Sequence, residues 1–176
     1  MLDQLGDELS KAGTYATIDV YGGVAMALAF WDGAASYDVD VVLNTQNHQA
    51  FWDITEIIAK KNGLPKEWVN EGVLPVVQED LNNQSLWSFG QYGGLTVRLP
   101  AAEQLLAMKV FSARLEKADL THAAVLCRRL GIDAPAEIYG ILHAYVKEDA
   151  IKKQNRRKGR HNCIHNFVAE LVKELQ

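Results

Sequence analysis

Residues 21–43, YGGVAMALAFWDGAASYDVDVVL, contain a glycine pair, a short helix of small residues and a strand with two aspartates. A turn without side chains at a helix N-terminus, such as Gly22-Gly23, lets backbone N–H groups approach a phosphate. Residues two apart in a strand point to the same side, so Asp38 and Asp40 are expected to project together. Neighbouring carboxylates repel unless a cation neutralises them, and oxygen ligands suit Mg²⁺ or Mn²⁺. The stretch therefore predicts a phosphate cradle and a metal-binding pair in one unit.

The segments around this stretch predict a mixture of helices and strands. Leucines at helical spacing predict an amphipathic helix at 2–12, and β-branched residues predict a strand at 15–21. In the helix expected at 46–61, the core stripe should consist of Phe51, Ile54, Ile57 and Ile58. The other helices are expected at 24–31, 65–70, 100–117, 119–132, 135–147 and 161–175, and the other strands at 38–43, 74–77, 86–89 and 95–99.

The glycine pair, the Ala-rich helix and the Asp-x-Asp strand together resemble the nucleotidyltransferase fold. Three later segments are similar to one bacterial branch of it, which contains minimal nucleotidyltransferase-like proteins of unknown function and relatives of the AbiEii toxins. These segments are GLPKEWVNEGV at 63–73, LTVRLPAAEQLLAMKVFSAR at 95–114 and DLTHAAVLCRRLGI at 119–132. The resemblance implies an α/β (α+β) fold, in which helices flank a mixed β-sheet. The core would span 1–118, and a C-terminal helical region would span 119–176.

The resemblance also implies roles for individual residues. Asp38 and Asp40 would be catalytic and hold the metal, Lys109 would contact the triphosphate, and Asp119 would be a catalytic acid facing the pocket. The residues expected to bind the nucleotide are Gly22, Gly23, Ser36, Trp68, Asn70 and Arg114. Three of these residues also have simple structural interpretations: a lysine among apolar helix residues usually reaches to solvent, Asp119 can cap a helix, and Trp68 can fill a core.

The sequence departs from the family pattern at two places. Ala34 and Ser36 stand where relatives commonly have an arginine and a threonine. A third carboxylate is expected on a late strand, where Thr96 and Arg98 occupy the alternating face. We interpret Asp19 as a strand-end or water-facing carboxylate, because it precedes the glycines.

Charge is unevenly distributed along the chain, whose net charge is −4. Residues 147–160 contain seven basic and two acidic residues, a local balance of +5 that leaves −9 for the rest. A basic segment of this kind either is a solvated surface or contacts a polyanion. The candidate RNA-binding residues are Lys152, Lys153, Arg156, Arg157, Lys158 and Arg160.

Histidine and cysteine spacing gives little sign of a transition-metal site. His161 and His165 are four residues apart on the last helix, but neither an HExxH motif nor a cysteine cluster accompanies them. Cys127 and Cys163 are expected to be reduced thiols in the core.

Composition is typical of a globular protein, with 48% hydrophobic and 23% charged residues among 176. No apolar run approaches the roughly 18 residues of a membrane span, and residues 1–13 are acidic, so a cytoplasmic protein without membrane contact is expected. The expected function is Mg²⁺-dependent transfer of a nucleotide from an NTP to an RNA, such as a tRNA end, or to a protein, with a toxin–antitoxin partner as one setting. The alternative is an inactive nucleotidyltransferase-like module that binds nucleotide, RNA or protein.

Overall fold

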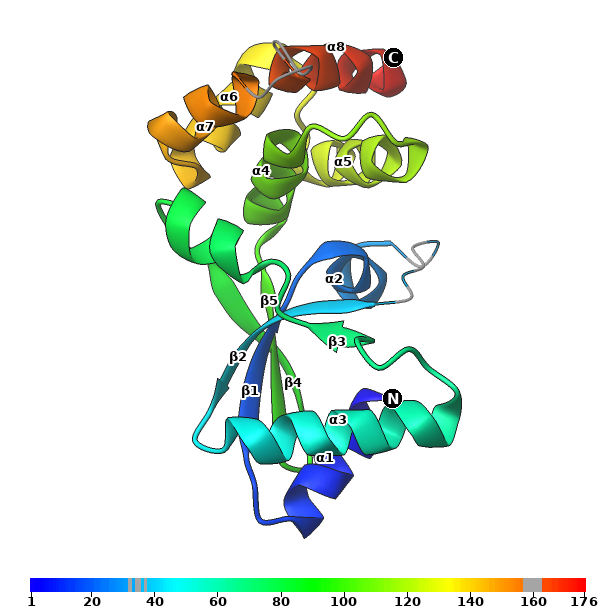
Figure 1. Cartoon of the computed structure of the whole chain (residues 1–176). Helices are drawn as coiled ribbons and strands as arrows, with labels where there is room; N and C mark the ends of the chain where they lie inside the picture. The colour runs from blue at the N-terminus through cyan, green and yellow to red at the C-terminus, as the bar shows by residue number, and fades with distance from the viewer. Residues whose placement is uncertain (32, 34–35, 37, 157–162) are drawn as a thin grey trace. The chain divides into compact units, whose positions relative to one another are not determined.

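The computed structural model describes residues 1–31, 33, 36, 38–156 and 163–176 (Figure 1). The chain forms two compact units. The sheet unit comprises residues 1–27, 35–74 and 86–100, and the helical unit comprises 28–34, 75–85 and 101–176. The helix that follows the last strand belongs to the helical unit, so this division differs from the expected 1–118 and 119–176.

The sheet unit contains a five-stranded mixed sheet in the order β3-β2-β1-β5-β4. Strand β1 pairs antiparallel with β2 and parallel with β5, while β4 and β5 form an antiparallel hairpin. Together with the flanking helices, this sheet confirms the predicted α+β class. The strands are β1 (Ala16–Val20), β2 (Val39–Thr45), β3 (Val69–Asn70), β4 (Leu86–Tyr92) and β5 (Leu95–Pro100).

One face of the sheet is apolar and buried. Leu43, Ile18 and Val97 are register partners across β2, β1 and β5, and all three are buried. Helix α1 (Leu2–Lys11) contacts β4, β5 and α3 (His48–Asn62), so its leucines extend the same core. The opposite face carries polar residues at most of the alternate positions, namely Thr17, Asp19, Asn44, Thr96 and Arg98, together with Val42.

The helical unit consists mainly of helices that follow β5. Helix α4 contacts α5, α6 and α8, and the apolar positions Leu106, Leu126 and Phe167 are fully buried. Cys127 and Cys163 are free and buried, as expected. The helices are α4 (Ala102–Ser112), α5 (Lys117–Leu130), α6 (Pro135–Tyr145), α7 (Glu148–Asn155) and α8 (Cys163–Leu175).

Two predicted elements are wrong in type. Residues 74–77 do not form a strand, because the chain turns into a π-helix at Val76–Asp80 (η1), and a short apolar run does not distinguish helix from strand. Residues 65–68 form a turn, with the Trp68 N–H donating to the Pro65 carbonyl, and β3 follows directly.

The predicted core stripe of α3 contains one error. Phe51, Ile54 and Ile58 are buried, but Ile57 is 60% exposed. At 100° per residue Ile57 lies off the face that the other three share. Helix α2 (Gly22–Ala29) starts two residues earlier than expected and includes both glycines.

Close packing of α1 on the β4–β5 turn gives a stability prediction. A Cβ atom at Gly6 would lie 1.7 Å from the Tyr92 carbonyl oxygen, and backbone cannot yield as a side chain can. Gly6→Ala should therefore lower the free energy of unfolding by about 2 kcal/mol or more. The control is Gly140→Ala in α6, where a Cβ meets nothing within 4 Å and should gain up to about 1 kcal/mol. Urea denaturation measures both, and equal stability of the two variants would contradict this packing.

Candidate functional site

Asp40 lies in β2 directly beside the start of α2. The Tyr21 N–H donates to the Asp40 carbonyl at 2.8 Å, which joins the end of β1 to β2. A Cβ atom at Gly22 would lie 2.6 Å from Oδ2 of Asp40, and one at Gly72 would lie 3.9 Å from Oδ1. Gly22 also has a φ of +67°, a conformation that favours glycine. The structure thus places the Asp40 carboxylate against the glycine turn.

Asp38 lies one residue before β2 and is exposed. The Ser36 hydroxyl donates to Oδ1 of Asp38 at 2.9 Å and lies 3.0 Å from the Asp38 carbonyl. Asp38 therefore lies outside β2, and the alternation of side chains along the strand does not determine where its carboxylate points. The prediction that Asp38 lies inside this strand is wrong by one residue. Ser36 acts in the structure as a local hydrogen-bond partner of this aspartate.

Trp68 and Asn70 have different environments. The Trp68 ring is 3% exposed and its Nε1–H donates to the Thr55 carbonyl at 3.1 Å, so this residue fills the core. Asn70 is the register partner of Asp40, and its Oδ1 accepts the Gly72 N–H at 2.8 Å. Asn70 therefore shapes the turn beside Asp40, whereas the predicted nucleotide contact by Trp68 has no exposed ring to support it.

The interpretation of Asp19 as a strand-end carboxylate is wrong. Asp19 is a register partner of Val42 and of Arg98, in the middle of the sheet. Arg98 donates to both of its carboxylate oxygens, from Nε at 2.6 Å and from Nη2 at 2.9 Å. Strand alternation puts this pair on the same sheet face as Asp40, and the hydrogen bonds to Asp19 raise the pKa of Arg98 above its usual range. The opposite charges at positions 19 and 98 were the sequence signal for this pair.

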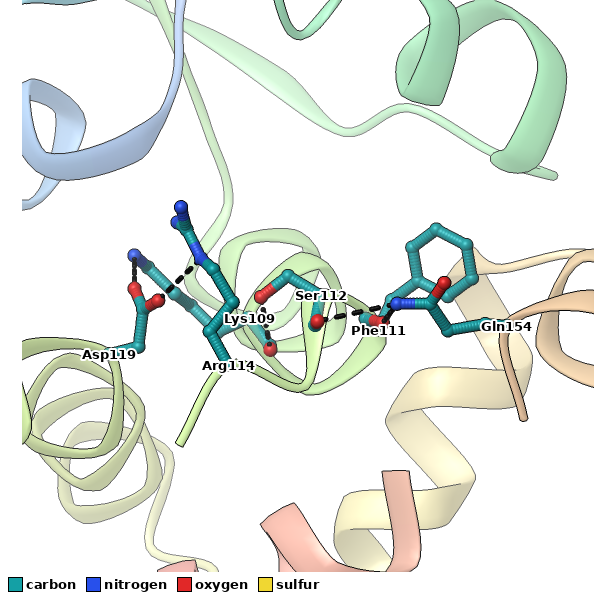
Figure 2. Close-up of polar contacts among 6 residues, drawn as sticks. All are labelled: Lys109, Phe111, Ser112, Arg114, Asp119 and Gln154. Carbon is teal, nitrogen blue, oxygen red and sulfur yellow. Dashed lines mark hydrogen bonds and ion pairs between the residues drawn. The ribbon is translucent and has the colours of Figure 1, made fainter. Parts of the chain in front are cut away.

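Three of the predicted site residues meet in the helical unit, between α4 and α5 (Figure 2). Lys109 donates from Nζ to Oδ1 of Asp119, and Nε of Arg114 lies 2.8 Å from Oδ2 as an ion pair. Lys109 is 8% and Asp119 is 4% exposed. Lys109 therefore does not reach to solvent as an isolated lysine would, because a buried carboxylate neutralises it.

The expected N-cap role of Asp119 is also corrected. Helix α5 begins at Lys117 with Glu116 as its N-cap, and Asp119 lies within the first turn. The other contacts in Figure 2 connect α4 to α7, since Nε2 of Gln154 donates to the carbonyls of Phe111 and Ser112 at 3.1 and 3.3 Å. The C-terminal end of α4 is therefore bound to α5 through the Lys109–Asp119 ion pair and to α7 through the hydrogen bonds of Gln154.

His122 lies one turn after Asp119 on α5, and the sequence analysis did not single it out. It is 6% exposed, and its ring meets the Trp31 ring edge-on at a centroid distance of 5.5 Å. Its Nδ1 atom has no hydrogen-bond partner among the described residues. Burial lowers the pKa of His122, and the charge of Lys109 adds to this effect while Asp119 opposes it. Its spacing of three from Asp119 was the available signal.

The basic segment is described only in part. Lys152, Lys153 and Arg156 are exposed at the end of α7, and Lys152 lies 3.6 Å from Glu148. Arg157, Lys158, Arg160 and His161 lie outside the described residues. His165 shares a hydrogen bond of 3.1 Å with the Tyr139 hydroxyl. In the described ranges, no three His, Cys, Asp or Glu side chains are grouped as a metal site.

The sequence-predicted site residues therefore form two groups. Gly22, Gly23, Asp40 and Asn70 belong to the sheet unit, whereas Lys109, Arg114 and Asp119 belong to the helical unit. Comparison with known proteins adds no further assignment, because no family model, curated protein or solved structure matches this chain. Every helix in the described ranges is too short or too polar to cross a membrane.

The buried ion pair in the helical unit gives a stability prediction. Asp119→Ala leaves the buried Lys109 ammonium without its carboxylate, so the free energy of unfolding should fall by about 3–5 kcal/mol. The control is Glu170→Ala, which removes the exposed partner of Lys173 and should cost less than about 1 kcal/mol. Combining Lys109→Met with Asp119→Leu should recover most of the loss. Chemical denaturation gives all three values, and similar costs for Asp119→Ala and Glu170→Ala would refute the role of the pair.

The environment of His122 gives a pH prediction. Its pKa is lowered in the folded protein, so the unfolded chain binds more protons as the pH falls below the ordinary value of about 6.5. The resulting stability is fully present above that value and is lost as the pH falls toward the folded pKa. Unfolding free energies of wild type and His122→Gln, measured between about pH 5 and pH 8, should differ most at the high end. The exposed His48→Gln serves as control, and a pH-independent difference for His122→Gln would contradict the prediction.

Proposed function

We propose that this chain is a Mg²⁺-dependent nucleotidyltransferase that transfers a nucleoside monophosphate from an NTP to an RNA or protein acceptor. The observation that supports it most is the contact between the Asp40 carboxylate and the side-chain-free turn at Gly22. A helix start that can bind phosphate and a carboxylate that can hold a metal are then close enough for one nucleotide to contact both. A tRNA end is the acceptor we favour among RNAs, and a toxin–antitoxin pair is the setting we propose.

The residues at this place suit a magnesium ion. Asp38 and Asp40 supply hard oxygen ligands, and the lack of a side chain at Gly22 lets the Asp40 carboxylate lie close to the start of α2. Magnesium held by Asp38 and Asp40 would supply positive charge against the α-phosphate and the leaving pyrophosphate. Mn²⁺ has the same ligand preference and is the expected substitute.

Each of the two units contains groups that suit phosphate oxygens. The first N–H groups of α2, from Gly22 onward, have no partner within the helix and carry the positive end of the helix dipole, so they suit phosphate oxygens. In the helical unit, Lys109 and Arg114 share one carboxylate, which leaves one net positive charge. The Arg114 side chain is 53% exposed, so its guanidinium is available to a phosphate as well.

The acceptor is proposed from charge. The exposed residues Lys152, Lys153 and Arg156 at the end of α7 provide positive charge that would contact an RNA backbone. Such contacts fix position without reading sequence. An RNA acceptor would therefore be bound less tightly as salt increases.

The test is label transfer from each radioactive NTP, with Mg²⁺ and either total RNA or lysate protein. Asp40→Asn keeps the side-chain shape and removes the charge, so transfer should fall by about 100-fold or more. Asp7→Asn, the same change on exposed α1, should leave transfer unchanged. Absence of transfer by the wild type, or undiminished transfer by Asp40→Asn, would refute the proposal.

A second candidate function is a nucleotidyltransferase-like module that binds nucleotide, RNA or protein without catalysis. The observation that favours it is the engagement of Asp19 by Arg98, because this acid on the same sheet face as Asp40 is already neutralised. Calorimetry distinguishes the two. Metal-dependent NTP binding without turnover supports the module, and absence of NTP binding excludes nucleotide recognition in both.

A further inference from the structure

A row of four uncharged polar side chains crosses the sheet at the end remote from Asp40. Thr17 in β1 is the register partner of Asn44 in β2 and of Thr96 in β5, and Thr96 is the partner of Gln91 in β4. Register partners point to the same face, so the four side chains form one row on the polar face. Asn44 follows Asp40 by four residues along β2, which separates the row from Asp40 by roughly 13 Å.

This row is the floor of a hollow of about 430 Å³ that lies entirely within the sheet unit. The volume is in the range of about 300–1,000 Å³ found for small-molecule sites. Two loops and Gly94 form its walls, and hydrogen bonds fix them. The Thr45 hydroxyl donates to the Tyr15 carbonyl at 2.8 Å, and the Ala16 N–H donates to the Gly94 carbonyl at 2.9 Å. The loops that form the walls are residues 13–15 and 45–47.

The lining of this hollow is polar and neutral. None of its lining residues is charged, although 23% of the residues in the whole chain are charged. The side chains of Thr17, Asn44, Gln91 and Thr96 make no hydrogen bond to any described residue, so their donors and acceptors are available to a ligand. Each amide has two donors and an acceptor, and each hydroxyl can do both. Such a set suits ligand hydroxyls, which also both donate and accept.

The rim adds an aromatic surface. Tyr15 lines the hollow and is 71% exposed, more than any other large hydrophobic residue that the structure describes. A tyrosine ring offers an apolar face beside a polar edge, which suits the alternating C–H and O–H surface of a sugar ring. A phosphorylated or carboxylated ligand would find no cation among the lining residues.

We propose that this hollow binds a neutral, hydroxyl-rich small molecule, namely a saccharide, at a site separate from the proposed nucleotide site. Asn44 and Gln91, at the two ends of the row, bind ligand hydroxyls. Thr17 and Thr96 contact the ligand from the middle of the row, and Tyr15 covers one ring face. The proposal rests on the sheet unit alone and does not depend on nucleotidyl transfer.

The experiment is a titration of the ¹⁵N-labelled full chain, followed by NMR, with glucose, galactose, N-acetylglucosamine and maltotriose. At least one should give saturable shifts in residues 13–17, 44–47 and 91–96, with a Kd of about 1 mM. Asn44→Ala, which truncates an exposed side chain, should weaken binding at least tenfold, as should Thr96→Val, which replaces a hydroxyl by a methyl group. Gln78→Ala, an exposed amide on η1, is the matched control and should bind as the wild type does.

Two further arms make the outcome decisive. Glucose 6-phosphate should bind no more tightly than glucose, and Asp40→Asn should bind saccharide as the wild type does. The proposal is overturned if none of the four saccharides gives saturable shifts, if Asn44→Ala retains full affinity, or if the phosphorylated sugar binds more tightly.

Discussion

The close approach of the Asp40 carboxylate to Gly22 is the constraint on which the rest of the candidate site depends. It exists because β1 and β2 pair antiparallel up to Val20 and Val41, and the next hydrogen bond, from Tyr21 to the Asp40 carbonyl, extends the ladder into the helix start. Any side chain at position 22 would occupy the space of Oδ2. A single backbone conformation therefore sets both the beginning of α2 and the surroundings of the carboxylate.

Two other carboxylates of the chain are neutralised across elements that lie far apart in sequence. Asp19 is held by Arg98 from β5, and Asp119 by Lys109 from α4. Buried pairs of this kind contribute little net stability, because desolvation offsets their attraction, but a wrong partner leaves a charge buried. Their effect is to select which elements pack together. Asp19 specifies the β1–β5 neighbourhood in the sheet, and Asp119 specifies the α4–α5 neighbourhood among the helices.

The sequence predicted features that depend on neighbours along the chain. The β4–β5 hairpin, the amphipathic α1 and the glycine turn before Asp40 all follow from local patterns. The sequence did not predict the features that depend on contacts between residues far apart in the chain. Residues 74–77 turn into a π-helix, and the β-bridge just after it joins Leu81 to Val146. Asp119 forms an ion pair with Lys109 and does not cap its helix. The environment of His122 depends on the Trp31 ring and on the charge of Lys109, both distant in sequence. Spacing alone contains no information about such long-range contacts.

The position of β1 has a consequence for how the chain is made. This strand lies in the interior of the sheet, yet its parallel neighbour β5 begins about 80 residues later, and α1 packs on the turn that precedes β5. During synthesis, β1 can pair with β2 on one edge, but its other edge has no partner strand until residues 95–100 of β5 have been made. Contacts that close such long loops form slowly, and an unpaired strand edge can associate with another chain in the meantime. A nascent chain therefore exposes one edge of β1 while the residues between β2 and β5, 46–94, are being synthesised.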